Sequence, residues 1–451
     1  MSNRSSHELD MVNGSILPKL LIFALPLAGS SILQLLFNAA DVVVLGRYVG
    51  SNALAAVGST GSLTSLIVNL FIGISIGVNV IISNTYAAGK YEEVSEIVHT
   101  SIATSVVCGA FLVIVGFIVI EPMLHLMGFP EEVLPLSRQY LLIYFCGMPF
   151  IMLYNFGAAI MRSVGDTKRS LIYLTIAGVT NVILNLFFVI VLKMGVAGVA
   201  LATTISNGIS AGLVTRALIM EDSCLHLDLK KLNLNRNTVF KIAKIGIPAG
   251  LQSVCFSLSN VIIQSSINSF GAVVMAGNSA AANLEGFYYA AMHSIYNASI
   301  TFTGQNYGAR KYSRINKVYL NAILALAIIA AIFSPLFYFA GPQLLSLYNT
   351  DPQVIQAGMI RMTVFACTYY ICGLMDVSSG ISRGLGYGLP PTLISLGGSV
   401  AFRIIWVSTV FAATRDYMML LIGYPISWAL TSAAHYIFFR IVRRRFPKED
   451  A

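Results

Sequence analysis

Twelve long apolar runs constrain this chain more than any other feature of its sequence. Each has about 20 residues or more, enough to cross the roughly 30 Å hydrocarbon core of a bilayer as a helix. Only 10% of the 451 residues are charged and 56% are hydrophobic, too little charge to cover a soluble protein of this length. The sequence therefore predicts an all-α polytopic membrane protein with twelve transmembrane helices. The predicted spans are 18–46, 52–83, 98–120, 139–161, 170–192, 195–218, 241–268, 275–303, 318–340, 358–380, 391–412 and 418–441.

The basic residues are unevenly distributed along the chain. Most of the 28 Lys and Arg lie before the first span, in the even-numbered loops or in the tail "RIVRRRF" (440–446). The positive-inside rule makes this side cytoplasmic, so both termini are expected in the cytoplasm. This asymmetry accounts for the net charge of +9, and no nucleic acid is needed to explain it. The basic tail is expected to anchor on anionic lipid.

The chain contains two copies of one pattern at a constant spacing. The aligned pairs are "NTYAAGKYEEV" (84–94) with "QNYGARKYSRI" (305–315), "IMRSVGD" (160–166) with "ISRGLGY" (381–387), and Gly50 with Gly271. Each copy holds six predicted spans, an even number, so both copies have the same orientation. The sequence thus predicts two parallel six-helix bundles related by a pseudo-two-fold axis along the membrane normal.

This repeat sets the expected domain organisation. An N-terminal six-helix lobe is expected over residues 1–218 and a polar, basic cytoplasmic linker over 219–240. A C-terminal six-helix lobe with the basic cytoplasmic tail is expected over 241–451. Two such lobes around a central cleft suit transport by alternating access.

Polar residues inside the first and fifth spans are the main functional candidates. Gln34, Asn38 and Asp41 lie at helical spacing on one stripe, and Asn181 and Asn185 lie one turn apart. A carboxylate among amide and hydroxyl oxygens can hold a hard cation such as Na⁺. Burial also disfavours the charged form of a carboxylate, which lets the group take up and release a proton. Asp41 is therefore predicted to couple an ion, with purely structural hydrogen bonding between helices as the alternative.

The second half of the chain carries further ionisable candidates. Tyr369 and Asp376 share one face of the tenth span, where Asp376 either takes part in coupling or substrate binding or pairs with Arg383. Glu285 is deeper in the eighth span and is a candidate for the same roles, with nearby Asn and Tyr side chains as structural partners. Arg403 is counted as the only basic residue well inside a span. It is expected to pair with a carboxylate or to reach a lipid headgroup.

No pattern for chemical catalysis stands out. The sequence has no Walker A motif, no HExxH motif and no nucleophile motif in a recognisable context, and the glycines near 384–388 follow no strand. We therefore expect no catalytic residues, no cofactor and no bound metal other than Na⁺ at Asp41. Gln34, Asn38 and Gln252 are candidates for the lining of a substrate cleft.

Several motifs of the sequence resemble those of a known family. The run "DVVVLGRYVGSNALAAVG" (41–58), the segments "YAAGK" and "GQNYGARK", and "RSVGDTKRS" with its partner "SRGLGYGLPP" are similar to the multidrug and toxic compound extrusion (MATE) transporters, over nearly the whole chain. The resemblance implies an antiporter of the bacterial inner membrane. Such a protein exports organic cations or related toxic compounds in exchange for H⁺ or Na⁺.

The resemblance also implies a coupling site in the N-terminal lobe. The family's aspartate of the first helix falls on Asp41, and its polar residues of the fourth, fifth and sixth helices fall on Asn155, Asn181, Asn185 and Thr203. Many members of the DinF type have Asp where this chain has Asn185, so the site here has one negative charge instead of two. In the NorM-like branch an acid on the seventh helix pairs with one on the tenth. The tenth-helix acid resembles Asp376, but the seventh helix of this chain has no acid, so the branch stays open and H⁺ is favoured over Na⁺.

Two alternatives to the antiporter remain. A flippase for lipid-linked oligosaccharides from the same superfamily needs basic residues in the membrane to hold pyrophosphate. An intramembrane enzyme or a receptor is disfavoured by the missing catalytic motifs and by the six-plus-six repeat. The expected partners are a cationic or amphiphilic small molecule and the lipid bilayer, with no nucleic acid, and the chain is expected to act as a monomer.

Overall fold

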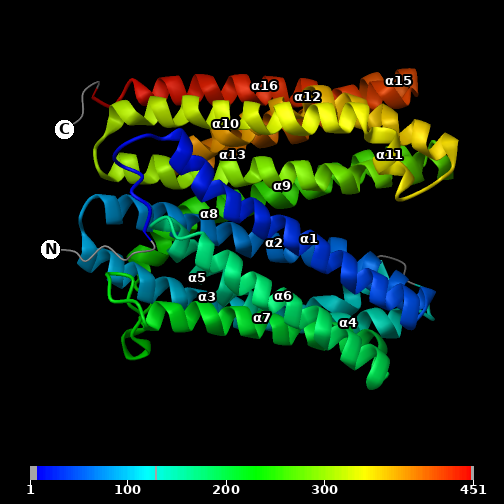
Figure 1. The fold of residues 1–451 in the computed structure, drawn as a ribbon, viewed down its shortest axis with the longest axis horizontal. Coiled ribbons are helices and arrows are strands. Elements are labelled where there is room, and N and C mark those ends of the chain that lie inside the picture. Colours follow the sequence, from blue (N-terminus) through cyan, green and yellow to red (C-terminus); the bar gives the residue numbers. More distant parts are fainter. Residues whose placement is uncertain (1–7, 127–129, 448–451) are drawn as a thin grey trace. The chain divides into compact units, whose positions relative to one another are not determined.

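The computed structural model describes residues 8–126 and 130–447 (Figure 1). Among these residues the regular elements are helices, and no strand occurs. Three of them, η1, η3 and η4, are π-helical, and η2 is a 3₁₀ turn. The elements in chain order are α1 (Leu17–Tyr48), α2 (Ser51–Ala87), α3 (Tyr91–Leu126), α4 (Leu134–Cys146), α5 (Met148–Ser163), α6 (Lys168–Leu186), η1 (Phe187–Val191), α7 (Gly195–Ile219), η2 (Leu229–Lys231), α8 (Arg236–Asn268), α9 (Ala272–Gly308), α10 (Tyr312–Phe339), α11 (Gly341–Ser346), α12 (Pro352–Gly384), α13 (Leu389–Ser395), η3 (Leu396–Ala401), α14 (Phe402–Trp406), η4 (Val407–Phe411), α15 (Ala412–Thr414) and α16 (Tyr417–Arg443).

The helices agree with the predicted membrane spans. In the described residues, ten helical segments are long and apolar enough to cross a membrane, and α4 with α5 forms an eleventh that is bent by 46°. The bend lies at Gly147, where Pro149 at the start of α5 lacks an N–H to continue the hydrogen-bond ladder. The helix α9 has 37 residues but is not among these apolar segments. With α9 as the twelfth span, the arrangement is consistent with twelve helices in two bundles.

Contacts divide the chain into two compact units. The N-terminal unit holds residues 8–9 and 29–246, and the C-terminal unit holds residues 10–28 and 247–447. Two helices therefore change unit along their length. The start of α1 belongs to the C-terminal unit, whereas the start of α8 belongs to the N-terminal unit. This division differs from the expected lobes at residues 10–28 and 219–246. Lys448 of the basic tail lies outside the described residues.

Different contacts hold the start of α1 in the C-terminal unit and the start of α8 in the N-terminal unit. Phe23 of α1 meets Phe302 edge-to-face, with ring centroids 5.9 Å apart in the C-terminal unit. On α8, the carbonyl of Ile242 lies 2.3 Å from where a Cβ on Gly77 of α2 would lie. Only a glycine at position 77 allows this approach of the two backbones.

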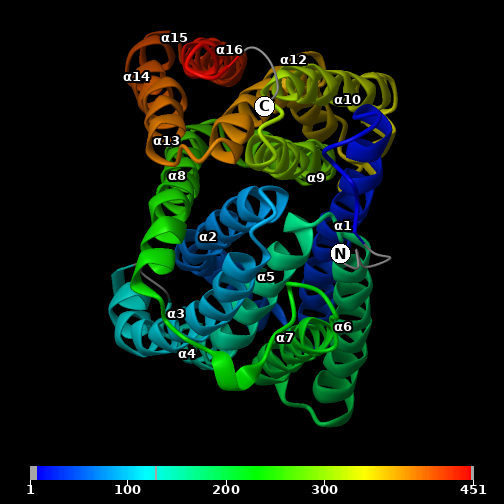
Figure 2. The ribbon, with the colours of Figure 1, turned by 90° about the vertical axis from the view of Figure 1, so that its left-hand side faces the viewer.

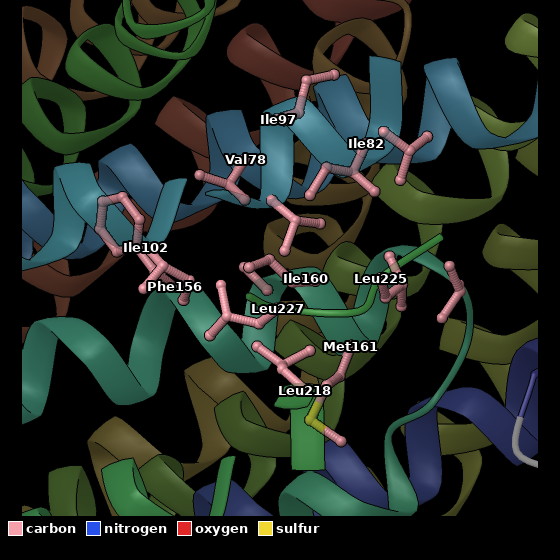
Figure 3. Packing of buried hydrophobic residues seen from close by; sticks show 14 of the residues in the cluster. Val78, Ile82, Ile97, Ile102, Phe156, Ile160, Met161, Leu218, Leu225 and Leu227 are labelled. Carbon is pink, nitrogen blue, oxygen red and sulfur yellow. The ribbon is translucent and has the colours of Figure 1, made fainter. Parts of the chain in front are cut away.

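A hydrophobic cluster lies in the N-terminal unit where α2, α3, α5 and α7 meet the segment after α7. Val78 of α2, Phe156 of α5 and Leu218 of α7 point toward one another in this cluster (Figure 3). Leu225 and Leu227 of the segment after α7 are also part of it, each at most 2% exposed. The polar linker is thus folded onto the N-terminal unit, because its two leucines bury apolar surface there.

The C-terminal unit is built around α12. This helix packs against α9, α10 and α16, which Figure 2 shows nearly end-on. Close contact with α9 depends on glycine: a Cβ on Gly384 would lie 2.7 Å from the carbonyl oxygen of Ile300.

The predicted internal repeat is visible in the backbone. Gly50 before α2 and Gly271 before α9 both have positive φ angles, of 119° and 90°. Gly165 and Gly386, which the repeat also aligns, have φ angles of 96° and 90°. These backbone conformations are ones that residues with a Cβ rarely adopt, so the two sequence copies preserve the same turns at the same places.

Candidate functional site

A chain of hydrogen bonds joins three helices of the N-terminal unit inside the predicted membrane region. Asn185 Nδ2 on α6 donates to Asp41 Oδ1 on α1, and the same nitrogen donates to Asn181 Oδ1 at 3.1 Å. Asn181 Nδ2 in turn reaches Thr203 Oγ1 on α7 at 3.4 Å. Four of the residues predicted for the coupling site are therefore brought together.

A close approach between α1 and α6 allows this contact. The ring of Phe37 on α1 lies where a side chain of Gly178 on α6 would be, 1.7 Å from the position of its Cβ. Phe37 lies one turn before Asp41, and Gly178 lies one turn before Asn181. The missing side chain of Gly178 thus brings the two polar stripes into hydrogen-bond distance.

Apolar packing fixes the C-terminal end of α1 beside this cluster. Val44 and Leu45, the first residues after the turn that carries Asp41, are buried with Val189 of η1 and Val199 of α7. Tyr140 of α4 packs against the same group. Asp41 is therefore held between helices, with its carboxylate facing the amide of Asn185.

The cluster is rich in oxygen acceptors. Asn185 Oδ1 is buried and accepts no hydrogen bond from the described residues. Together with the Asp41 carboxylate and Thr203 Oγ1, it offers oxygen ligands of the kind that hard cations prefer. The described residues contain no group of three or more His, Cys, Asp or Glu side chains that would hold a metal ion. A single carboxylate among neutral oxygens fits the binding of a proton or of Na⁺.

The other candidates of the N-terminal unit do not join this network. Asn155 on α5 donates to the carbonyl of Ile151, one turn earlier in its own helix, at 2.8 Å. Gln34 and Asn38 are exposed on the stripe of α1 that carries Asp41. They remain candidates for a surface that meets substrate.

Glu285 in the C-terminal unit has a strong partner. Arg361 of α12 donates to its two carboxylate oxygens at 2.7 and 2.8 Å, and to Asn278 Oδ1 at 2.7 Å. The hydroxyl of Tyr417 donates to the same Asn278 oxygen at 3.2 Å. A bidentate, charge-assisted pair of this kind accounts for the burial of Glu285.

Asp376 is arranged differently. It makes no hydrogen bond and no ion pair within 4.0 Å to any residue that the structure describes, although Arg383, Arg403 and Tyr289 lie within electrostatic range. The alternative partner Arg383 instead donates to the hydroxyl of Tyr296 and to Gln252 Oε1, the latter at 2.7 Å. The structure therefore contradicts direct pairing of Asp376 with Arg383, and it gives Gln252 a structural partner.

Tyr369 belongs to an aromatic cluster of the C-terminal unit. Its ring centroid lies 5.1 Å from that of Tyr288, 5.3 Å from that of Phe365 and 5.5 Å from that of Trp428. Edge-to-face and tilted contacts of this kind stabilise a packed interior.

Sequence reasoning missed two buried arginines. Arg361 is 8% exposed and Arg383 is 3% exposed, although the sequence places the first at the start of a predicted span and the second after its end. This burial is within the protein, so the expectation that Arg403 is the only basic residue well inside a span stays a prediction. Arg361 lies near the start of an apolar run, where arginine is usually interpreted as flanking the membrane. The burial of Arg361 could have been inferred from Glu285, because a buried carboxylate needs a buried cation close to it.

Of the two environments expected for Arg403, a carboxylate partner or a lipid headgroup, the described residues test only the first. Arg403 pairs with no carboxylate within 4.0 Å among the described residues. Its Nε donates to Ser427 Oγ at 3.0 Å, and its guanidinium lies 4.5 Å from the ring centroid of Tyr424.

Known proteins match both halves of the chain. The family model MatE matches twice, at residues 26–187 and 248–407. The multidrug resistance protein YoeA of Bacillus subtilis, named as probable, is 26% identical over 432 residues, which cover 94% of this chain and 93% of that protein. A FAD transporter of Shewanella oneidensis is 26% identical over 409 residues, 89% of each chain. A crystal structure of a MATE protein in complex with MaL6 aligns with a TM-score of 0.91 at 19% identity, covering 98% of this chain and 99% of the other.

Proposed function

This chain belongs to the MatE family of multi-pass membrane transporters, and we propose that it is a secondary antiporter which exports organic cations and related toxic compounds in exchange for H⁺ or Na⁺. Its place is the cytoplasmic membrane of a bacterium, with both termini in the cytoplasm. It moves small molecules by alternating access and works without a cofactor.

The observation that carries this proposal is the hydrogen bond between Asp41 and Asn185 inside the membrane region. A carboxylate inside the membrane is energetically costly, so an ionisable residue kept there is by default a candidate for function. The hydrogen-bonded neighbours of Asp41 in the described chain are neutral, so its charge is left for an incoming cation to neutralise.

The steps of exchange follow from this geometry. From the outside, a proton or Na⁺ neutralises Asp41 and changes what its oxygens accept from Asn185. Because Asn185 also donates to Asn181, the change alters the contacts of α1 with α6. The rearranged helices release the exported compound outward.

The proton is the favoured coupling ion. Asn185 contributes no negative charge, so Na⁺ would be held by one carboxylate and by neutral oxygens. A proton needs only one carboxylate oxygen, and its binding removes the charge completely.

A flippase for lipid-linked oligosaccharides is the weaker alternative. It would need free buried cations to hold pyrophosphate. Arg361 and Arg383 already donate to side chains of their own unit, which leaves Arg403.

The test is the variant Asp41→Asn in cells that lack other drug pumps. It keeps the size and most hydrogen bonds of the side chain but cannot exchange a charge. We expect export of the cationic dye ethidium to be abolished at unchanged expression, and drug resistance to fall to that of cells without the protein. Resistance equal to that of the wild type would overturn the proposal.

A further inference from the structure

The interior of the C-terminal unit holds more positive than negative charge. Three arginines of its described part are at least nine-tenths buried: Arg361, Arg383 and Arg403, at 8%, 3% and 4% exposed. The acids among them are Glu285, which is 4% exposed, and the half-buried Asp376. Arg361 neutralises Glu285. The remaining buried charges are then those of Arg383 and Arg403 against the single carboxylate of Asp376, which leaves one positive charge in excess.

Arg403 is the cation with unused capacity. Its Nε donates to Ser427 Oγ, whereas its terminal nitrogens Nη1 and Nη2 donate to no described residue. Arg383, in contrast, uses both terminal nitrogens, on Tyr296, Gln252 and Thr392. A guanidinium presents five donors in a planar fork, and a buried one normally fills them.

Aromatic rings surround the free end of Arg403. Its guanidinium carbon lies 4.5 Å from the ring centroid of Tyr424 and 5.8 Å from those of Trp428 and Phe256. The cluster continues through Phe365, which lies 5.3 Å from Tyr424 and 5.4 Å from Trp428. These ring faces suit a flat aromatic compound beside the cation.

The backbone around Arg403 is irregular. Arg403 lies on the short helix α14, between the π-helical segments η3 and η4. Single π-helical turns inside transmembrane helices are frequent at functional sites, because the extra residue redirects side chains. The hydrogen-bond partner of Arg403, Ser427, lies on α16.

We propose that Arg403 and its aromatic neighbours Tyr424, Trp428 and Phe256 form a binding site for the anionic group of a planar aromatic compound. The terminal nitrogens hold a carboxylate, sulfonate or phosphate oxygen, and the rings contact the aromatic body. The site extends the range of exported compounds beyond cations. It rests on the transporter function proposed above, but binding at it needs no ion gradient.

Two dyes of the same scaffold and opposite charge test this site. Fluorescein is an anionic xanthene at neutral pH, and rhodamine 123 is a cationic one. Binding to the purified full-length protein in a neutral detergent is followed by fluorescence anisotropy, for the wild type and for Arg403→Gln. Because no gradient is present, loss of ion coupling leaves the result untouched, so this test fails independently of the Asp41 test.

The expected result is a loss specific to the anion. Arg403→Gln raises the Kd of fluorescein by about tenfold or more, the usual effect of losing a hydrogen bond to a charged group, and leaves that of rhodamine 123 within about twofold. Arg403→Lys keeps the charge and retains part of the fluorescein affinity. The matched control is Arg415→Gln, since Arg415 is exposed directly after α15 and its loss should change neither Kd.

Three outcomes overturn the proposal. The first is that fluorescein does not bind the wild type. The second is that Arg403→Gln weakens both dyes alike while its melting temperature stays within a few degrees of the Arg403→Lys variant. The third is that added phosphatidylglycerol displaces fluorescein at stoichiometric amounts, which would assign Arg403 to a lipid headgroup. If Arg403→Gln does not fold, the charge-retaining Arg403→Lys together with Trp428→Leu decides: unchanged fluorescein affinity in both variants contradicts the site.

Discussion

At the scale of single residues, the buried Glu285 and the half-buried Asp41 are stabilised in opposite ways. Glu285 receives two hydrogen bonds from Arg361, which neutralises it inside the protein. Asp41 receives a hydrogen bond from the neutral amide of Asn185. A carboxylate already paired with an arginine gains little from a second cation, whereas one that meets only amides gains much. This contrast separates a structural acid from a coupling acid.

The Glu285 pair gives a prediction on stability. Arg361→Gln leaves a buried carboxylate without its cation, and such losses typically cost about 3–5 kcal/mol. We expect a clear decrease in the melting temperature of the protein in detergent, followed by intrinsic fluorescence. The double variant Glu285→Gln/Arg361→Gln removes both charges and should recover most of that loss. A double variant no more stable than Arg361→Gln would show that the pair is not what holds Glu285.

The sequence predicted the cluster around Asp41 but not the pairing of Glu285 with Arg361, for a physical reason. Asn181 and Asn185 are one helical turn apart, so their shared face follows from helix geometry alone. Glu285 and Arg361 come from different helices, and no local period relates them. Which face of α9 meets which face of α12 is decided by packing, at glycines such as Gly384.

At the scale of helices, the coupling cluster depends on how closely α1 approaches α6. The side chain of Phe37 fills the space above Gly178, and this contact lies one turn from the hydrogen bond of Asp41. A helix crossing of this kind is fixed by the smallest residue in it. Gly178 therefore determines the geometry of the site although it is not one of the polar residues of the cluster.

Gly178→Ala should disturb export while the protein still folds. Its new methyl group overlaps the ring of Phe37, and overpacking of this kind costs about 1–3 kcal/mol. We expect export of ethidium to decrease at unchanged expression, and Gly178→Ala/Phe37→Leu to restore part of it. The control is Gly212→Ala on α7, where no atom lies within 4 Å of the added carbon. Equal export by Gly178→Ala and Gly212→Ala would contradict this role of the helix crossing.

The linker shows where the sequence misleads at this scale. Residues 219–240 are polar and basic overall, which favours a mobile connection. Two leucines in that segment, Leu225 and Leu227, are buried in the cluster of Figure 3. His99 of α3 adds a hydrogen bond, because its Nε2 accepts from the backbone N–H of Asp228 at 3.0 Å. Two buried side chains are too few to change the average composition, so a composition argument does not find them.

At the scale of the whole molecule, the boundary between the two units is not a single point in the sequence, because each unit contains a segment from the other half of the chain. Residues 10–28 belong to the C-terminal unit, where the carbonyl of Met11 accepts from Asn306 Nδ2 at 3.2 Å. Residues 236–246 belong to the N-terminal unit, where Ile242 joins the hydrophobic cluster. The six-plus-six repeat was predictable from the aligned motifs, but these exchanged segments were not, because both lie at ends of apolar runs that continue without interruption.

Splitting the chain tests this exchange. We expect fragments 1–232 and 233–451 to copurify when they are expressed together in one cell, since each completes the unit of the other. Either fragment alone lacks helical packing partners and should aggregate or be degraded. Two fragments that are each stable and monodisperse when expressed alone would contradict the division.

The most direct test of coupled export through Asp41 is transport in proteoliposomes. The purified protein is reconstituted with a pH-sensitive dye in the lumen, and ethidium is added with and without Na⁺ in an imposed ion gradient. We predict that ethidium movement changes the lumenal pH for the wild type, independently of Na⁺, and that Asp41→Asn shows neither the pH change nor ethidium transport. Ethidium transport by Asp41→Asn at the wild-type rate, with the same change in pH, would contradict the account.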